Sequence, residues 1–136
     1  LANQYGLKLI HIPELQEMYF GEWEGISTQE IYENSPELLS NFWQFPTRFT
    51  PPNAENMDDF VKRVLSGLDT VKLEMHKLNA KQSLIVTHGG VIKLLKCIAF
   101  QHTFDDVLKM HANLGQLNHF YFTEKHQLKC IEETVK

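Results

Sequence analysis

The segment that most constrains the fold is an apolar run at 91–100, which directly follows a Gly-Gly pair and a shorter apolar stretch at 82–86. Apart from Lys93 and Lys96 the run is apolar on nearly every side, so a helix formed by it must be buried. The shorter stretch is typical of a buried strand. A strand that leads straight into a buried helix indicates an α/β fold, in which helices cover a sheet.

The rest of the chain supplies further helices and strands. Residues 27–30 form a capping box, Ser-Thr-Gln-Glu, which predicts a helix that ends before Pro36. Pro36 opens a second helix, and Asn56 caps the strongest one, in which apolar residues recur at helical spacing from 57 to 78. Strands are predicted at 7–12, 82–86, 117–123 and 127–132.

This order of elements predicts a three-layer α/β/α domain with a mostly parallel sheet and an antiparallel edge. A chain of 136 residues suits one domain, so we expect 1–136 to form a single unit. In open α/β sheets, ligands bind beyond the carboxyl ends of the strands. That rule points to residues 87–90, Thr-His-Gly-Gly, which follow the predicted strand at 82–86.

Composition and charge exclude several classes of protein. Apolar residues make up 43% of the chain and charged residues 22%, which disfavours disorder, and no apolar run reaches the roughly 20 residues of a membrane span. The net charge of −4 disfavours nucleic acid as a partner. Two cysteines, Cys97 and Cys130, are typical of reduced thiols in a cytoplasmic protein. The oligomeric state stays open.

The start of the chain predicts a missing upstream segment. There is no initiator Met and no signal peptide. Residues 1–6 are instead typical of the end of a helix that Gly6 terminates. We therefore expect the domain to be truncated at its N-terminus.

The glycine pair after His88 is the first candidate site. Gly89 and Gly90 allow a ligand to approach the backbone closely, and the start of the following helix presents free N–H groups to an anion. A histidine at this point can carry a charge beside an anion or transfer a proton to it. The alternative is a tight turn that His88 merely caps.

The acidic loop at 15–25 is the second candidate. It holds three carboxylates, Glu17, Glu22 and Glu24, among large aromatic side chains. Aromatic surroundings favour the protonated form of a carboxyl group, which a general acid requires. The alternative is a solvated acidic loop anchored by Phe20 and Trp23, and the residues themselves do not select one glutamate.

Glu55 is a third candidate, because it directly precedes the strong helix and can either cap it or line a pocket. Metal chemistry is not expected, since no H-E-x-x-H occurs and the histidines fit no known ligand spacing. The sequence also contains no G-x-S-x-G motif of a serine nucleophile and no P-loop motif. We expect no cofactor.

Three segments, taken in order, resemble the histidine phosphatase superfamily, whose fold is phosphoglycerate-mutase-like. Residues 15–25 are similar to its L-x-E-x-x-F-G-x-W-E-G motif, and 86–90 to its second histidine motif. Residues 52–56, followed by Arg63, resemble its P-x-G-E-S…R segment, with Ala54 and Asn56 in place of Gly and Ser. The loop at 43–56 is most similar to that of α-ribazole phosphatases, which act in cobalamin biosynthesis.

The resemblance implies phosphomonoester hydrolysis through a phosphohistidine. It implies that Glu17 is the general acid and then the base, and that His88 steadies a phosphate oxygen. Gly89, Glu55 and Gln116 are implied in substrate binding, with Asn113 close to Gln116 in sequence. The resemblance also implies that the helix-and-loop region 26–56 is a substrate lid. It implies that the partner of the site is a small phosphorylated molecule.

The same resemblance implies that this chain is a poor catalyst. The family's nucleophile lies in an R-H-G motif and a further arginine in S-P-L-x-R, and neither motif occurs here, where the only arginines are Arg48 and Arg63. Alternatives are another phosphatase of the superfamily, a phosphoglycerate mutase, or a non-catalytic phosphate-binding domain. An unpaired sheet edge could also make the chain associate with itself.

Overall fold

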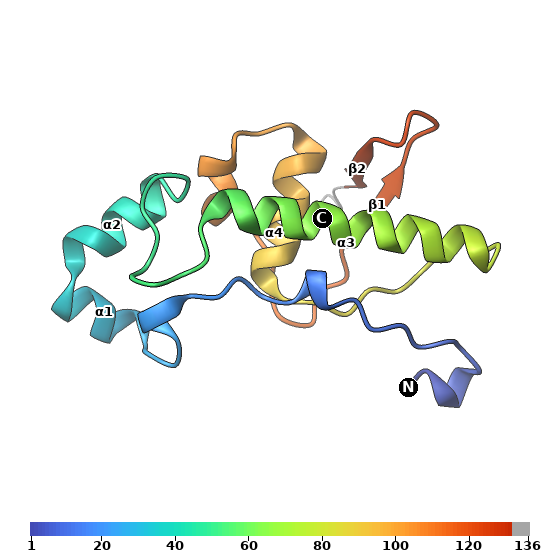
Figure 1. The fold of residues 1–136 in the computed structure, drawn as a ribbon, viewed down its shortest axis with the longest axis horizontal. Coiled ribbons are helices and arrows are strands. Elements are labelled where there is room, and N and C mark those ends of the chain that lie inside the picture. The colour runs from blue at the N-terminus through green and yellow to red at the C-terminus, as the bar shows by residue number, and fades with distance from the viewer. Residues whose placement is uncertain (132–136) are drawn as a thin grey trace, which may run out of the picture.

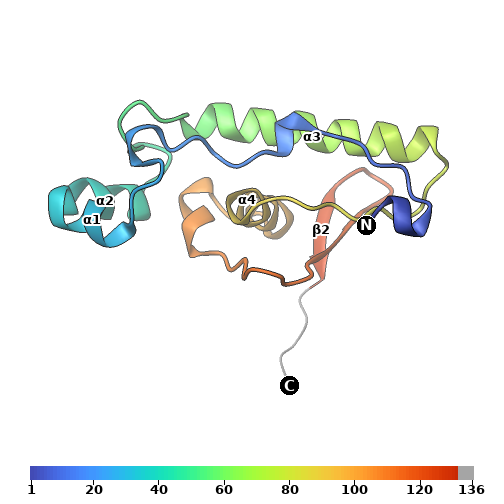
Figure 2. The same cartoon turned by 90° about the horizontal axis from the view of Figure 1, so that it is seen from below.

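The long helix α3, Met57–Lys77, crosses the middle of the view in Figure 1 of the computed structural model, which describes residues 1–131. In the view of Figure 2 the same helix runs along one side of the molecule. Asn56 caps α3 as predicted, because its side-chain oxygen accepts a hydrogen bond of 2.8 Å from the Asp59 N–H. Gly67 lets a 3₁₀ turn at Pro13–Leu15 pack closely on α3, since a Cβ at Gly67 would lie 2.7 Å from Leu15 Cδ2.

Helix α4, Gly89–Phe100, is the buried helix that the apolar run predicts. Val91, Leu94 and Cys97 on it are fully inaccessible to solvent. They join the apolar face of α3 in one core cluster, together with residues of the N-terminal loop and the C-terminal strand. Burial on all sides thus fixes α4 in the centre of the molecule, as Figure 2 shows in a view along its axis.

Two short helices, α1 (Thr28–Asn34) and α2 (Pro36–Gln44), form the end of the molecule near the start of α3 (Figure 1). The N-terminal cap of α1 forms as predicted, because the Glu30 N–H donates a hydrogen bond of 3.2 Å to Ser27 Oγ. Trp23 packs edge-on against Phe42 of α2, with ring centroids 5.9 Å apart. This pair attaches the two helices to the acidic loop.

The sheet within residues 1–131 is an antiparallel hairpin of β1 (His119–Phe122) and β2 (Leu128–Ile131). Phe120 faces Cys130 in its register. Both strands are shorter than predicted, and position 132 of the second predicted strand lies outside the described residues. The hairpin packs its inner face on α4 and closes the core.

Two predicted strands, 7–12 and 82–86, do not form. Each segment lacks a paired neighbour within residues 1–131, and a strand exists only where another strand supplies its hydrogen bonds. The prediction of a mostly parallel sheet is therefore not confirmed: the part of the chain that the structure describes is mostly helical.

Candidate functional site

His88 stands at the N-terminus of α4. Its backbone is extended (φ −116°, ψ 161°) and its carbonyl accepts the first helical hydrogen bond, 3.1 Å from the Ile92 N–H. Its imidazole makes no capping bond and lies exposed at the surface. The apolar run that follows forms α4, which begins at Gly89. His88 therefore lies at the positive end of the helix dipole.

Glu17 reaches the same helix start from the acidic loop. One of its carboxylate oxygens, Oε2, accepts a hydrogen bond of 3.1 Å from the Gly90 N–H, and the other accepts one of 2.9 Å from the Met18 N–H. Gly90 lets the carboxylate come this close, because a Cβ there would lie 2.2 Å from Glu17 Oε1 and the carboxylate would have to shift. The helix N-terminus therefore already holds an anionic group, supplied by the protein itself.

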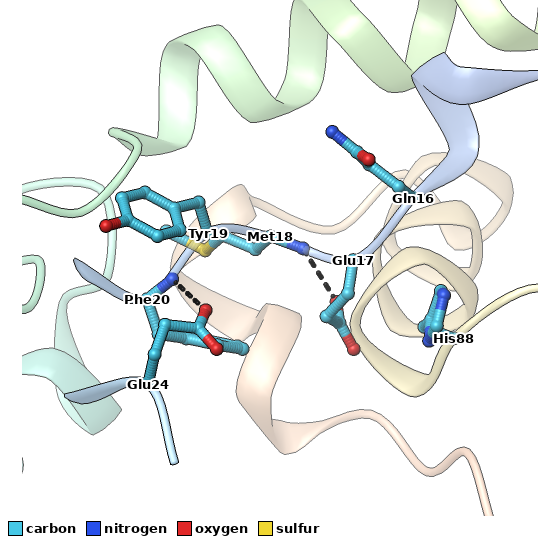
Figure 3. Close-up of a pocket in the computed structure, with 7 residues that line it drawn as sticks. All are labelled: Gln16, Glu17, Met18, Tyr19, Phe20, Glu24 and His88. Carbon is cyan, nitrogen blue, oxygen red and sulfur yellow. Dashed lines mark hydrogen bonds between the residues drawn. The ribbon is translucent and has the colours of Figure 1, made fainter. Parts of the chain in front are cut away.

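An open recess of about 500 Å³ lies over these groups (Figure 3). It is lined by Gln16, Glu17, Met18, Tyr19, Phe20, Glu24 and His88. Figure 3 shows Glu17 directed toward the start of α4 beside His88, whereas Glu24 turns back to accept a 2.7 Å hydrogen bond from the Phe20 N–H. Among the three loop glutamates, Glu17 is the one that bonds the start of α4, next to His88.

The loop that carries Glu17 is held from behind by Arg63 on α3. The guanidinium donates to the carbonyl oxygens of Glu14 (2.8 Å), Gln16 (2.9 Å) and Glu17 (3.3 Å). It also forms a two-bond pair with the Glu55 carboxylate, with both contacts at 2.9 Å. We refer to Arg63, Glu55 and these three carbonyls as the arginine clamp.

Electrostatics within the clamp favour both charged forms. The side-chain hydrogen bond from Arg63 lowers the pKa of Glu55, and the bond to Glu55 in turn raises the pKa of Arg63, in each case against the desolvation of a half-buried group. Glu55 also bonds Tyr19 twice, accepting from its N–H through Oε1 (3.3 Å) and donating its own N–H to the Tyr19 carbonyl (3.0 Å). The clamp thus fixes the loop on both sides of Glu17.

A match to the histidine phosphatase superfamily (branch 1) extends over residues 1–133. The chain belongs to this superfamily. The family resemblance of the three motifs is thereby confirmed. Members are phosphatases that act on small phosphorylated substrates.

Individual relatives agree with this assignment. The chain is 29% identical to a bifunctional protein of Mycobacterium tuberculosis over 98% of its own length and 36% of that protein. It is 34% identical to the adenosylcobalamin/α-ribazole phosphatase of Escherichia coli over 62% of its length and 40% of that protein. The structure of the α-ribazole phosphatase of Shigella flexneri matches it with a TM-score of 0.73 at 21% identity, over 96% of this chain and 62% of that one. The chain thus spans less than two thirds of these relatives, and the structural likeness shows the fold.

This histidine phosphatase domain brings together only some of the predicted site residues. Glu17, His88 and Gly89 gather at the start of α4, whereas Glu55 lies in the clamp behind the loop. Gln116 is occupied locally, because its side-chain oxygen accepts a 3.3 Å bond from the Asn113 N–H and neither residue lines the recess. The predicted lid region 26–56 forms α1, α2 and the loop that leads to Glu55.

Two site contacts lie beyond what the sequence predicts. Arg63 is part of a matched motif, but nothing in its spacing indicates three bonds to loop carbonyls. Thr87 Oγ1 donates a 2.6 Å hydrogen bond to the Leu15 carbonyl and so joins the two site segments. Both contacts link residues more than 40 positions apart, and no local pattern encodes them.

Neither a metal-binding cluster nor a membrane-spanning helix is found within residues 1–131. No three histidine, cysteine or acidic side chains gather in a way that could hold a metal ion. No helix in this range has the length and apolar character needed to cross a bilayer. The chemistry available at the recess is that of one imidazole, one carboxylate and the backbone N–H groups at a helix start.

Proposed function

We propose that this domain hydrolyses phosphomonoesters through a phosphohistidine intermediate, as part of a polypeptide that supplies the nucleophilic histidine. The observation that carries the proposal is the meeting of Glu17, His88 and the Gly90 N–H at one recess. These groups are a carboxyl group, an imidazole and a backbone N–H at a helix start, the kinds of group that serve proton transfer and stabilise phosphoryl oxygens in phosphoryl transfer.

In the proposed first step, a histidine nitrogen attacks phosphorus in line, and the bond from phosphorus to the ester oxygen breaks. The leaving alkoxide takes the proton of Glu17. In the second step, water attacks the phosphohistidine and passes a proton to Glu17, while the phosphorus–nitrogen bond breaks. Phosphate leaves, and Glu17 is protonated again for the next cycle.

His88 and Gly89 act on the phosphoryl oxygens in this mechanism. The imidazolium of His88 donates to a non-bridging oxygen, and the backbone N–H groups of Gly89 and Gly90 face the same anion at the start of α4. Gly90 now bonds the Glu17 carboxylate. Bound phosphate therefore competes with the Glu17 carboxylate for this N–H.

We propose that the nucleophilic histidine is supplied from outside residues 1–136. No R-H-G occurs in the 136 residues, so we propose that 1–136 alone binds phosphate without turning over esters. Glu55 acts here through the clamp, by holding the loop of Glu17. We propose that Gln116 contacts the substrate and that 26–56 forms a lid over it. Tyr32, Trp43 and Phe49 of this region are exposed.

For the substrate we propose α-ribazole 5′-phosphate, with a role in cobalamin biosynthesis in the cytoplasm. The support is the likeness to the α-ribazole phosphatases of two bacteria and the length of the loop at 43–56. Competition between α-ribazole 5′-phosphate, phosphoserine and 3-phosphoglycerate in a steady-state assay tests this choice. Preference for phosphoserine or 3-phosphoglycerate would contradict this choice and assign the domain to that substrate instead.

The catalytic proposal is tested with the polypeptide that the complete coding region encodes. Replacing Glu17 by Gln should lower kcat by roughly 10²–10⁴-fold with little change in KM, because proton transfer belongs to the transition state. Glu22→Gln is the matched control, since Glu22 is a loop carboxylate outside the recess. An equal loss in both variants, or a change in KM alone for Glu17→Gln, contradicts the assigned role.

A further inference from the structure

A second recess, here called the hairpin recess, lies at the opposite end of α4 from His88. It has a volume of about 230 Å³ and forms where the middle of α3, the end of α4 and the β1–β2 hairpin meet. Its lining residues are Leu65, Leu68, Lys72, Ile98, Gln101, Phe122, His126, Gln127, Leu128 and Lys129. The 12 residues of α4 separate it from the start of that helix by roughly 18 Å, at 1.5 Å per residue. The hairpin recess is therefore distinct from the recess of Glu17 and His88.

The hairpin recess is apolar inside and polar at its mouth. Half of its lining residues are apolar side chains from α3, α4 and the hairpin, and two of them, Leu68 and Leu128, are buried. The amide side chains Gln101 and Gln127 are exposed. Apolar walls with a few polar groups at the opening are typical of sites for small organic molecules.

Lys72 is the charged group that lies between the apolar walls. Its ammonium is 4.6 Å from the centre of the Phe122 ring, 3.4 Å from the His126 carbonyl oxygen and 4.0 Å from Asp69 Oδ1. These groups meet because the turn of the hairpin lies beside α3 (Figure 2). The two oxygen distances are long, since N–H···O bonds are typically about 2.9 Å.

The surroundings of Lys72 favour a closer anionic partner. An ammonium group has three donors, and the side chain of Lys72 is 31% exposed, so water solvates the charge only in part. A charge that is partly removed from water is stabilised most by an opposite charge within hydrogen-bond distance. An anion that enters the hairpin recess supplies such a partner at Lys72.

Charge and size together define the ligand. Lys72 and Lys129 bring two positive charges to the hairpin recess, and Asp69 offsets one of them. One negative charge on the ligand balances the remainder. The volume of about 230 Å³ is smaller than the roughly 300–1,000 Å³ of sites for drug-sized molecules. The apolar walls require an apolar body beside the charge, because an inorganic ion would leave them in contact with water.

We propose that the hairpin recess binds a small monocarboxylate with a compact apolar body. The carboxylate accepts a hydrogen bond from Lys72 Nζ, and the body packs on Leu65, Ile98 and Leu128. Burial of apolar surface and the charge-assisted hydrogen bond supply the affinity. The site shares no lining residue with the recess of Glu17 and His88. The proposal therefore goes beyond phosphoester hydrolysis and does not depend on it.

The test is a titration of the polypeptide that the complete coding region encodes, followed by NMR of its methyl and amide groups. The probe is benzoate, which joins one carboxylate to a compact apolar ring. Benzamide is the matched control ligand, because it has nearly the same shape without the charge. Inorganic phosphate is the control for an anion without an apolar body.

Benzoate should shift the methyl signals of Leu65, Ile98 and Leu128 saturably, with a Kd on the order of 1 mM. Benzamide should bind at least about tenfold more weakly, because a hydrogen bond to a charged group is lost. Phosphate should leave these signals unchanged. Equal binding of benzoate and benzamide, saturation by phosphate, or benzoate shifts confined to the Gly89 and Gly90 amides overturns the proposal. An absence of saturation by about 10 mM benzoate overturns it as well.

A pair of lysine variants tests the assigned contact. Lys72→Met keeps an unbranched apolar stem and removes the charge, so it should weaken benzoate at least about tenfold. Lys77→Met is the matched control, since Lys77 is an exposed lysine of α3 that pairs with Glu74 at 3.7 Å outside the hairpin recess. Circular dichroism checks the fold of both variants. Equal affinities of the two variants for benzoate contradict the proposal.

A second pair leaves Lys72 in place. Leu65→Asp puts a negative charge on the wall of the hairpin recess and should also weaken benzoate at least about tenfold. Leu73→Asp is its control, because Leu73 is likewise an exposed leucine of α3 but does not line the recess. Benzoate binding that is unchanged by Leu65→Asp, or weakened equally by Leu73→Asp, would place the ligand elsewhere and overturn the proposal.

Discussion

At the scale of single residues, one partly buried hydrogen-bond network decides where the catalytic carboxylate of the proposal lies. Three loop glutamates are equivalent in sequence, and the structure separates them by their hydrogen bonds. Glu17 bonds the start of α4, Glu24 bonds its own loop, and Arg63 holds the backbone of the segment that carries Glu17. Arg63 is the residue whose loss should disturb the site most without touching a ligand.

Replacement of Arg63 by Lys should destabilise the domain by about 2 kcal/mol. An ammonium group cannot bond Glu55 twice and the loop carbonyls at the same time, and it leaves half-buried acceptors unpaired. Urea denaturation gives the free energy of unfolding. Arg48→Lys is the control, since Arg48 is an exposed residue that stacks on Phe45, and it should cost less than about 0.5 kcal/mol. Equal costs would show that the clamp does not hold the loop.

The clamp also predicts a pH dependence of stability. Because Arg63 lowers the pKa of Glu55 in the folded protein, the unfolded chain binds the proton more tightly. The stabilisation is complete above the unfolded-state pKa, about 4.3, and is lost as pH falls through the lower folded-state value. The difference in unfolding free energy between the wild type and Glu55→Gln should therefore shrink as pH falls from 6 toward acid. A difference that is constant with pH contradicts this assignment.

The two cysteines should differ in reactivity. Neither forms a disulfide, in line with the sequence. Burial, with a smaller contribution from Asp106, raises the pKa of Cys97 to about 11, so very little thiolate exists near pH 8. Iodoacetamide at that pH should modify the half-buried Cys130 first and reach Cys97 only on unfolding. Mass spectrometry of tryptic peptides reads the order, and early modification of Cys97 contradicts it.

At the scale of elements, a helix follows from local sequence, whereas a strand also requires a neighbouring strand to pair with. The caps at Ser27 and Asn56 and the buried run of α4 are local signals, and the structure places all three helices as predicted. The strands predicted at 7–12 and 82–86 have the right apolar pattern. They still do not form within residues 1–131, because a strand takes its hydrogen bonds from a neighbour.

A glycine joins two loops of the site and gives a test at this scale. Gly21 has a positive φ of 58°, and a Cβ there would lie 2.2 Å from the Pro52 carbonyl oxygen. Gly21→Ala should cost at least about 3 kcal/mol of unfolding free energy. Gly25→Ala isolates the backbone strain, since Gly25 has a φ of 72° with no atom near its Cβ position, and it should cost about 1 kcal/mol. Equal costs would show that the contact with the loop at 51–54 is loose.

At the scale of the whole molecule, sequence predicts the place of the site better than the layer structure around it. The motif at 86–90 and the loop at 15–25 do meet at the start of α4, because both flank elements of one core. The parallel sheet depends on segments far apart in the chain, which local patterns do not bring together. The segments 7–12 and 82–86, whose apolar side chains stay exposed and whose backbone is not paired in a sheet within residues 1–131, show the same dependence. Gln116 instead bonds Asn113, its neighbour in sequence, and does not line the recess.

The central claim is that the start of α4, with His88 and Glu17, is a phosphate site, and a titration of ¹⁵N-labelled 1–136 with inorganic phosphate tests it most directly. The account predicts saturable shifts of the Gly89 and Gly90 amides and of the His88 imidazole. It also predicts tighter binding in Glu17→Gln at neutral pH, because the variant removes the carboxylate that competes for the Gly90 N–H. Shifts confined to other residues, or weaker binding in Glu17→Gln, would contradict it.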